Sequence, residues 1–106
     1  MDIVTFQETI RQFADYHKEL GPFTMVLALG KHYGDLTEKL HNVLENKDGE
    51  FTDEDKLKLA ITLGDLLNDI CNMSSDINFS MDDILNINLK KLQLEHEQKQ
   101  SKINEF

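Results

Sequence analysis

The sequence has few of the residues that interrupt or cross-link a chain: its 106 residues include one proline, five glycines, one cysteine and no tryptophan. The single cysteine, Cys71, cannot form an internal disulfide, and no group of Cys and His residues has the spacing of a zinc site. The two usual cross-links of a small fold are therefore excluded. We expect the chain to be stabilised by the packing of apolar side chains.

Long hydrophobic runs are also missing. No apolar stretch approaches the roughly 20 residues that a membrane-spanning helix needs. The N-terminal segment has no basic stretch followed by an apolar one, so no secretory signal is predicted. We therefore expect a cytoplasmic protein without a membrane partner.

Positive charge is scarce, since 20 Asp and Glu residues face 11 Lys and Arg residues and give a formal net charge of -9. Affinity for nucleic acids depends on Lys and Arg side chains that displace counterions from phosphates, so DNA and RNA polymers are not expected partners. A small phosphorylated ligand stays open, because a divalent cation can bridge carboxylates to a triphosphate.

Apolar residues recur at helical spacing, and the alternating pattern of strands is absent, so the chain is predicted to be all-α. Gly21 and Pro22 are expected to end the first helix, and Thr52 with Asp55 resembles a capping box that opens the third. The predicted helices cover residues 3–19, 24–46, 52–77 and 81 into the nineties, with a loop at 46–51. We predict one helical domain over 1–95 and a polar tail, expected to fray, over 96–106.

The first three predicted helices each carry an apolar stripe on one face, and that of the third is expected to face inward. The stripes are Leu29, Tyr33, Leu36, Leu40 and Val43 on the second helix, and Leu59, Leu63, Leu66, Leu67, Ile70 and Ile77 on the third. Ile61 lies opposite the third stripe and indicates a second packed face, although one exposed isoleucine is also common. Because a lone bundle of this size buries only a modest fraction of its surface, we predict a four-helix bundle completed by oligomerisation, as a homodimer or homotetramer.

Polar residues beside these stripes form a candidate metal site. His32 and Asp35 share one flank of the second helix, and Thr62, Asp65 and Asp69 follow one another at helical spacing on the third. Carboxylates that converge from facing helices hold divalent metals in helical bundles. The spacing alone also fits acids that line solvated helix faces.

Three segments together indicate a family: VLALGKHYGDLTEKL at 26–40, ITLGDLL at 61–67 and NLKKL at 88–92. Their order resembles that of the MazG-type nucleotide pyrophosphohydrolases over residues 3–95. That family has a Glu-x-x-Glu pair, a Glu-x-x-Asp pair in a Glu-Leu-Gly-Asp setting, and a later Asn-x-x-Lys-Leu. The resemblance implies hydrolysis of a nucleoside triphosphate to the monophosphate and pyrophosphate, with Mg²⁺ held by four acids.

The departures from this pattern fall on the metal ligands. His32 and Thr62 occupy the first and third glutamate positions, and Asp35 is a shortened glutamate. The loss of two charges weakens a Mg²⁺ site, whereas imidazole suits Mn²⁺. The resemblance implies metal ligands Asp35, Asp65 and His32, with Asp69 compensating, and substrate-binding residues Lys39, Asn88 and Lys91.

Three functions stay open at this point. The chain is a hydrolase with an altered metal site, a nucleotide-binding protein that has lost catalysis, or a helical interaction module.

Overall fold

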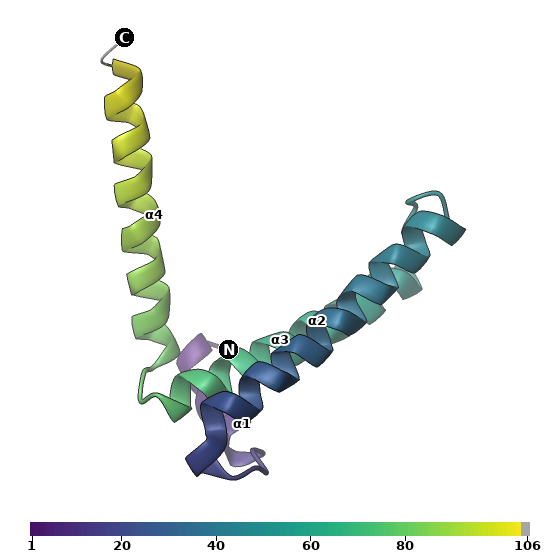
Figure 1. Ribbon diagram of the computed structural model, residues 1–106, viewed down its shortest axis with the longest axis horizontal. Helices are drawn as coiled ribbons and strands as arrows, with labels where there is room; N and C mark the ends of the chain where they lie inside the picture. The colour runs from purple at the N-terminus through teal and green to yellow at the C-terminus, as the bar shows by residue number, and fades with distance from the viewer. Residues whose placement is uncertain (105–106) are drawn as a thin grey trace.

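The computed structural model describes residues 1–104, and in this range the chain forms helices and no strand (Figure 1). The elements are α1 (Ile3–Gln12), the short 3-10 helix η1 (Lys18–Leu20), α2 (Gly21–Asn46), α3 (Asp53–Asp76) and α4 (Met81–Asn104). The predicted all-α class is confirmed. Within the same range, no helix combines the length and apolar character needed to cross a bilayer.

Helices α2 and α3 form a long antiparallel hairpin. At 26 and 24 residues, the two helices are each roughly 36 to 39 Å long. The loop between them turns through Asp48 and Gly49, both with positive φ. The predicted capping box is present, with the Thr52 hydroxyl accepting from the Asp55 N–H and the Asp55 carboxylate from the Thr52 N–H. Two backbone donors at the start of α3 are thereby satisfied.

The prediction of a first helix over residues 3–19 is wrong, because α1 ends at Gln12. Beyond this residue the chain is no longer helical, and the Tyr16 hydroxyl donates to the Asp76 carboxylate. The spacing of apolar residues along the sequence does not predict such a contact. Pro22 does not end a helix but lies in the first turn of α2. A proline fits there because the first N–H groups of a helix have no partner within it.

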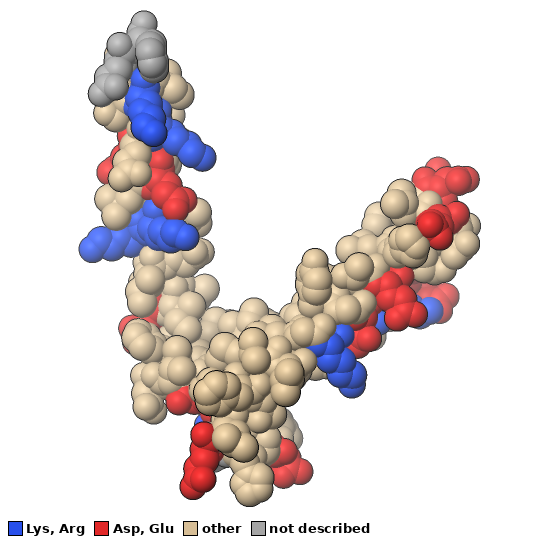
Figure 2. All heavy atoms as spheres, in the orientation of Figure 1, with Lys and Arg blue, Asp and Glu red and all other residues tan. Residues whose placement is uncertain are grey.

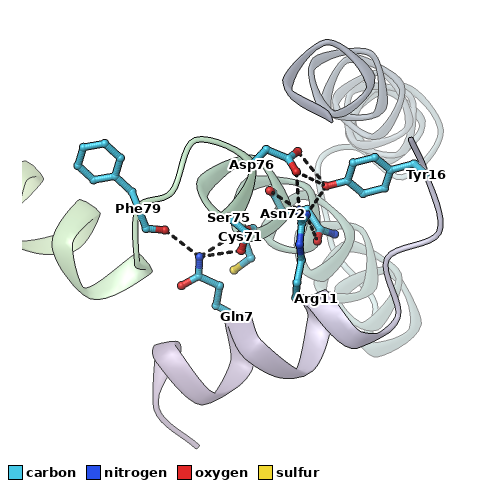
Figure 3. A network of polar contacts seen from close by, with 8 residues as sticks. All are labelled: Gln7, Arg11, Tyr16, Cys71, Asn72, Ser75, Asp76 and Phe79. Carbon is cyan, nitrogen blue, oxygen red and sulfur yellow. Dashed lines mark hydrogen bonds and ion pairs between the residues drawn. The ribbon is translucent and has the colours of Figure 1, made fainter. Parts of the chain in front are cut away.

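Gln7 joins α1 to the turn between α3 and α4 (Figure 3). Its amide nitrogen lies 3.0 Å from both the Ser75 hydroxyl and the Phe79 carbonyl, and its amide oxygen accepts from the Met81 N–H at 2.7 Å. The Gln7 side chain is buried. A buried amide with its donor and acceptor both engaged fixes the direction in which α4 leaves the fold.

The second anchor of α1 is the Asp76 side chain, which is fully enclosed. Arg11 Nη2 lies 2.8 Å from its Oδ1, and the Tyr16 hydroxyl donates to its Oδ2 at 2.8 Å (Figure 3). Burial and the neighbouring Asp76 carboxylate raise the pKa of Tyr16, so the hydroxyl keeps the proton that it donates. Gly21 packs directly against this carboxylate and leaves no space for a Cβ atom.

The apolar core is small, because four hydrophobic residues are buried in the part of the chain that the structure describes: Met25, Val43, Cys71 and Met81. Of the six side chains that α3 buries, five are polar. Tyr33, Leu63 and Ile77, which belong to the predicted stripes, are 65%, 54% and 50% exposed. Five of the eleven predicted stripe residues are thus exposed, Val43 is buried, and the other five are half-buried.

Helix α4 leaves the hairpin as a separate arm, so that the described chain has the outline of a V (Figure 1). Within α4, burial is confined to Met81 in the first turn. The helix runs to Asn104, further than predicted, and residues 105–106 of the predicted tail lie outside the described residues. The radius of gyration is 17.9 Å, against about 13 Å for a compact domain of this length.

The exposed surface of the chain is correspondingly large, at 8233 Å². A compact monomer of this mass exposes about 6,100 Å², so the difference is roughly 2,100 Å². Much of this surface is apolar, and it includes Ile61, which is 59% exposed. The V shape therefore leaves each arm without the cover that its apolar side chains need.

The contact between Gly21 and Asp76 leads to a stability prediction. We expect Gly21→Ala to lower the free energy of unfolding by about 2 kcal/mol or more, because the new methyl group displaces a buried carboxylate from its partners. Gly30→Ala is the matched control: a Cβ atom there would meet nothing within 4 Å beyond the adjoining backbone of the same helix, and the change should stabilise the chain by about 0.5 to 1 kcal/mol. Urea unfolding measures both, and shifts of the same sign contradict this account of Gly21.

Candidate functional site

Two ion pairs determine how α2 and α3 align. His32 Nδ1 lies 2.5 Å from Asp69 Oδ2, and near the loop Lys47 Nζ lies 2.6 Å from Asp55 Oδ1. In an antiparallel pair with this register, Asp35 lies at nearly the same level along the hairpin as Asp65. Both aspartates are partly buried. Their convergence on one metal ion stays a prediction.

His32 and Asp69, two of the predicted metal ligands, are in direct contact. Their side chains are 23% and 9% exposed, and each is the hydrogen-bond partner of the other. Such a pair can act in two ways. It can satisfy both groups as a simple ion pair, or Asp69 can orient the imidazole so that Nε2 serves as a ligand, as carboxylates commonly do for metal-binding histidines.

Thr62, which stands at a glutamate position of the family pattern, does not offer its hydroxyl to a ligand. The side chain is buried and donates to the Lys58 carbonyl at 3.1 Å, one turn earlier in the same helix. This is the usual bond of a threonine inside a helix. The residue therefore contributes to the contact between α2 and α3.

No group of three or more His, Cys, Asp or Glu side chains is close enough to hold a metal ion within residues 1–104. Mg²⁺ prefers several oxygen ligands, including charged carboxylates. His32 supplies a nitrogen, and Asp69 already has a partner in that imidazole. The donor set within one chain is thus a poor fit to Mg²⁺ and a better fit to a metal that accepts imidazole, such as Mn²⁺.

A cleft of about 400 Å³ lies along the hairpin beside Asp35. Its charged lining residues are three lysines, Lys39, Lys47 and Lys58, and three acids, Asp35, Glu38 and Asp55. With equal numbers of both signs, the cleft suits a ligand of mixed charge better than a bare anion. Lys39, a predicted substrate-binding residue, belongs to this cleft.

Sequence reasoning missed the pair at the loop end of the cleft. The ammonium group of Lys47, together with the Thr52 N–H, lowers the pKa of Asp55 to about 2. The two residues are eight positions apart and lie on either side of the loop. A lysine just after the end of α2, eight residues before the acid of the capping box, was the available signal.

The other two predicted substrate-binding residues, Asn88 and Lys91, lie on α4. Both are exposed, and Lys91 is 3.8 Å from Glu95 on its own helix. Because α4 is a separate arm, one chain does not bring these residues to the cleft (Figure 1).

No protein-family model, curated protein or solved structure matches this chain. The resemblance to the MazG-type enzymes therefore rests on the residue pattern.

The Lys47–Asp55 pair leads to a prediction about pH. The pKa of Asp55 is about 2 in the folded chain and 3.8 as its ordinary value. The pair therefore stabilises the fold above about pH 4, and this contribution is lost as the pH falls towards 2. We expect Lys47→Met to lower the melting temperature at pH 7 but to match the wild type near pH 2. Lys56→Met, at an exposed position of α3, is the control and should have little effect at either pH.

Proposed function

We propose that this chain is a self-associating helical protein of MazG-like architecture whose eroded metal site has lost nucleoside triphosphate pyrophosphohydrolase activity; weak or altered activity belongs to the second candidate below. The observation that carries the loss of activity is the replacement of two family glutamates by His32 and Thr62. The resemblance places His32 at a metal-ligand position, and this residue contacts Asp69, the acid expected to compensate for the missing glutamates. A second position, Thr62, is bonded to its own backbone.

Electrostatics supports this proposal. Four carboxylates repel one another until a divalent cation binds, so a site that keeps them is stabilised by its metal. Here His32 and Thr62 stand in place of two of the four acids, and His32 Nδ1 contacts Asp69. Fewer like charges meet at the site, so a gain in stability on binding Mg²⁺ is no longer built in.

A second candidate function is retained hydrolysis with a changed metal. It is favoured by the shared level of Asp35 and Asp65 beside a cleft that contains Lys39. In this case Asp35, Asp65 and His32 Nε2 would hold Mn²⁺ or Mg²⁺, and a bound metal would polarise the phosphate that a water attacks. Asp69 would orient the imidazole, and Lys39 would meet phosphate oxygens.

Pyrophosphate release separates the two candidates. We expect the wild-type chain, tested against each nucleoside triphosphate with Mg²⁺ and with Mn²⁺, to release no more pyrophosphate than Asp65→Asn. A colorimetric pyrophosphate assay measures this. Metal-dependent release that Asp65→Asn abolishes would instead establish the second candidate.

The double variant His32→Glu with Thr62→Glu tests whether the two replaced glutamates are the reason for weak metal binding. It restores the two missing charges of the family pattern, so we expect Mn²⁺ to raise its melting temperature by several degrees, as a ligand at about 100 times its Kd adds about 2.7 kcal/mol. The wild type should not respond. An equal response of both proteins would mean that His32 and Thr62 do not limit metal binding.

Self-association is proposed from the surface of the chain. Its excess over a compact monomer is roughly 2,100 Å², whereas one partner in a typical stable complex buries about 800 Å². Tyr33, Leu40 and Leu44 are 65%, 41% and 67% exposed along one side of α2. A row of exposed apolar side chains of this kind is typical of a surface that binds a partner.

Sedimentation velocity tests this part of the proposal. We expect a mass of two or four chains down to submicromolar concentrations, because the apolar surface of a V-shaped chain disfavours the free monomer. The control is Lys31→Glu, a change of an exposed residue that should leave the mass unaltered. A monodisperse monomer at tens of micromolar would contradict self-association.

A further inference from the structure

The cleft along the hairpin has an acidic end towards the middle of the two helices. This end is lined by Asp35, Glu38 and Lys39, whose formal charges sum to -1. Asp35 and Glu38 are three residues apart on one helix, so their negative charges repel each other. None of the three residues forms an ion pair with another residue of the described chain. Because Lys39 pairs with neither acid, the two carboxylates are open to the ammonium group of a ligand.

The loop end of the cleft has the opposite balance, since Lys47, Lys58 and Asp55 line it and their formal charges sum to +1. Asp55 is already satisfied, because Lys47 Nζ lies 2.6 Å from its Oδ1 and the Thr52 N–H donates to its Oδ2 at 3.0 Å. An ammonium group has three donors, of which Asp55 accepts one. Lys58 pairs with Glu54 at 3.2 Å, and both of these side chains are exposed, so the pair is weak and easily exchanged. Donors of both lysines are therefore open to the carboxylate of a ligand.

Between its two ends, the cleft has an apolar floor and an amide donor. Val43, which is 3% exposed, and Leu59, which is half-buried, line this part. Asn42 Oδ1 accepts from Asn46 Nδ2 at 2.6 Å. The NH2 group of Asn42 is thus left as a donor without a partner in the described chain. A carbonyl oxygen next to an apolar side chain fits this combination, and a peptide unit supplies both.

The dimensions of the cleft limit the length of the ligand. Lys39 and Lys47, one at each end, are eight residues apart, which corresponds to about 12 Å along a helix axis. An extended tripeptide spans about 10 to 11 Å, and the hydrogen bonds at its two ends account for the remainder. The cleft volume of about 400 Å³ is within the range of small-molecule sites, which is about 300 to 1,000 Å³.

We propose that the cleft binds a short peptide with free termini. The ammonium group of the peptide donates to the Asp35 and Glu38 carboxylates at the acidic end. Its carboxylate accepts from Lys47 and Lys58 at the loop end, and a carbonyl oxygen along its length accepts from Asn42. This inference goes beyond the proposed function, because it requires neither self-association nor hydrolysis.

Other classes of ligand fit this distribution of charge less well. Figure 2 shows acidic and basic side chains interspersed along one edge of the hairpin arm. A polyphosphate would bring negative charge to the acidic end of the cleft, and a polyamine would bring positive charge to the lysines of the loop end. A single amino acid has both charges but is too short to reach both ends.

An NMR titration of the full chain with the tripeptide Ala-Leu-Ala tests the inference. EDTA is present throughout, so that no metal ion competes for Asp35. We expect saturable shifts of amide signals, concentrated in residues 35–59, with a Kd below about 1 mM. Acetylation of the N-terminus or amidation of the C-terminus removes one charge of the peptide, and each should raise the Kd at least about tenfold. Equal binding of a peptide blocked at both termini, or no saturable shift up to about 10 mM, would overturn the proposal.

Two variants assign the ends of the peptide. Lys58→Met should raise the Kd of the free tripeptide about fivefold but leave that of the C-amidated peptide within about twofold. Glu38→Gln should act in the same way on the free and the N-acetylated peptide. Both residues are exposed, so neither change should alter the fold. The matched control is Glu45→Gln, which removes an exposed acid of α2 outside the cleft and should leave every Kd within about twofold. Equal weakening of all peptides by a variant would overturn its assigned contact.

Tripolyphosphate and spermidine, titrated in the same way, test the other ligand classes. We expect neither to saturate the cleft below about 10 mM. Tighter binding of either one than of the tripeptide would assign the cleft to a ligand of one charge and overturn the proposal. A failure of the peptide to bind would leave self-association and the loss of hydrolysis intact, because sedimentation and pyrophosphate release measure those separately.

Discussion

The contact between α2 and α3 through their polar flanks is the constraint on which the rest of the structure depends. His32 with Asp69 joins the two helices near the middle of the hairpin, and Lys47 with Asp55 joins them at its loop end. Polar pairs of this kind are directional, so they specify both the register and the rotation of each helix. With these pairs in contact, five of the eleven predicted stripe residues stay exposed. The open V has a separate cause, which is the turn between α3 and α4 that Gln7 contacts.

The sequence predicts the helical elements well where local signals are strong. Thr52 and Asp55 form the capping box that their spacing indicates, and the loop before them turns at Asp48 and Gly49. The end of α1 could not be predicted, because Tyr16 leaves the helical path to reach Asp76, 60 residues away. Helical periodicity also identifies apolar stripes without identifying what covers them. For that reason Leu63 and Ile77 were assigned to the inside of the fold, although they are exposed.

The candidate site was predictable to a similar extent. Helical spacing placed His32 and Asp69 on facing flanks, and they do meet. Spacing could not tell a metal ligand from a partner in an ion pair, because both uses require the same side chains at the same distance. The cleft residues Lys47 and Asp55 were missed, since their contact depends on how the loop closes. Asn88 belongs to α4, whose direction is determined by a tertiary contact.

The hairpin shows how a metal site and an ion pair can be alternative solutions to one problem. Acids that face each other across two helices need positive charge between them. A bound cation supplies it, whereas a histidine in place of one acid removes a negative charge and offers a ring nitrogen to another acid. A hairpin with a histidine in place of an acid keeps its fold in the absence of any ion. Selection can then act on the helical scaffold and no longer on metal binding.

The amide of Gln7 has one more implication. Its nitrogen faces two oxygen atoms, from Ser75 and Phe79, while its oxygen faces the Met81 N–H. A carboxylate has the same shape but would set oxygen against oxygen at the Phe79 carbonyl, whereas the Ser75 hydroxyl can turn to donate to it. Replacing one nitrogen by oxygen would thus weaken the joint between the arms without removing a single carbon atom. The amide shares this joint with the Ser74 hydroxyl, which donates to the same Phe79 carbonyl at 2.7 Å, so the angle of the V depends on a small group of polar contacts at one turn.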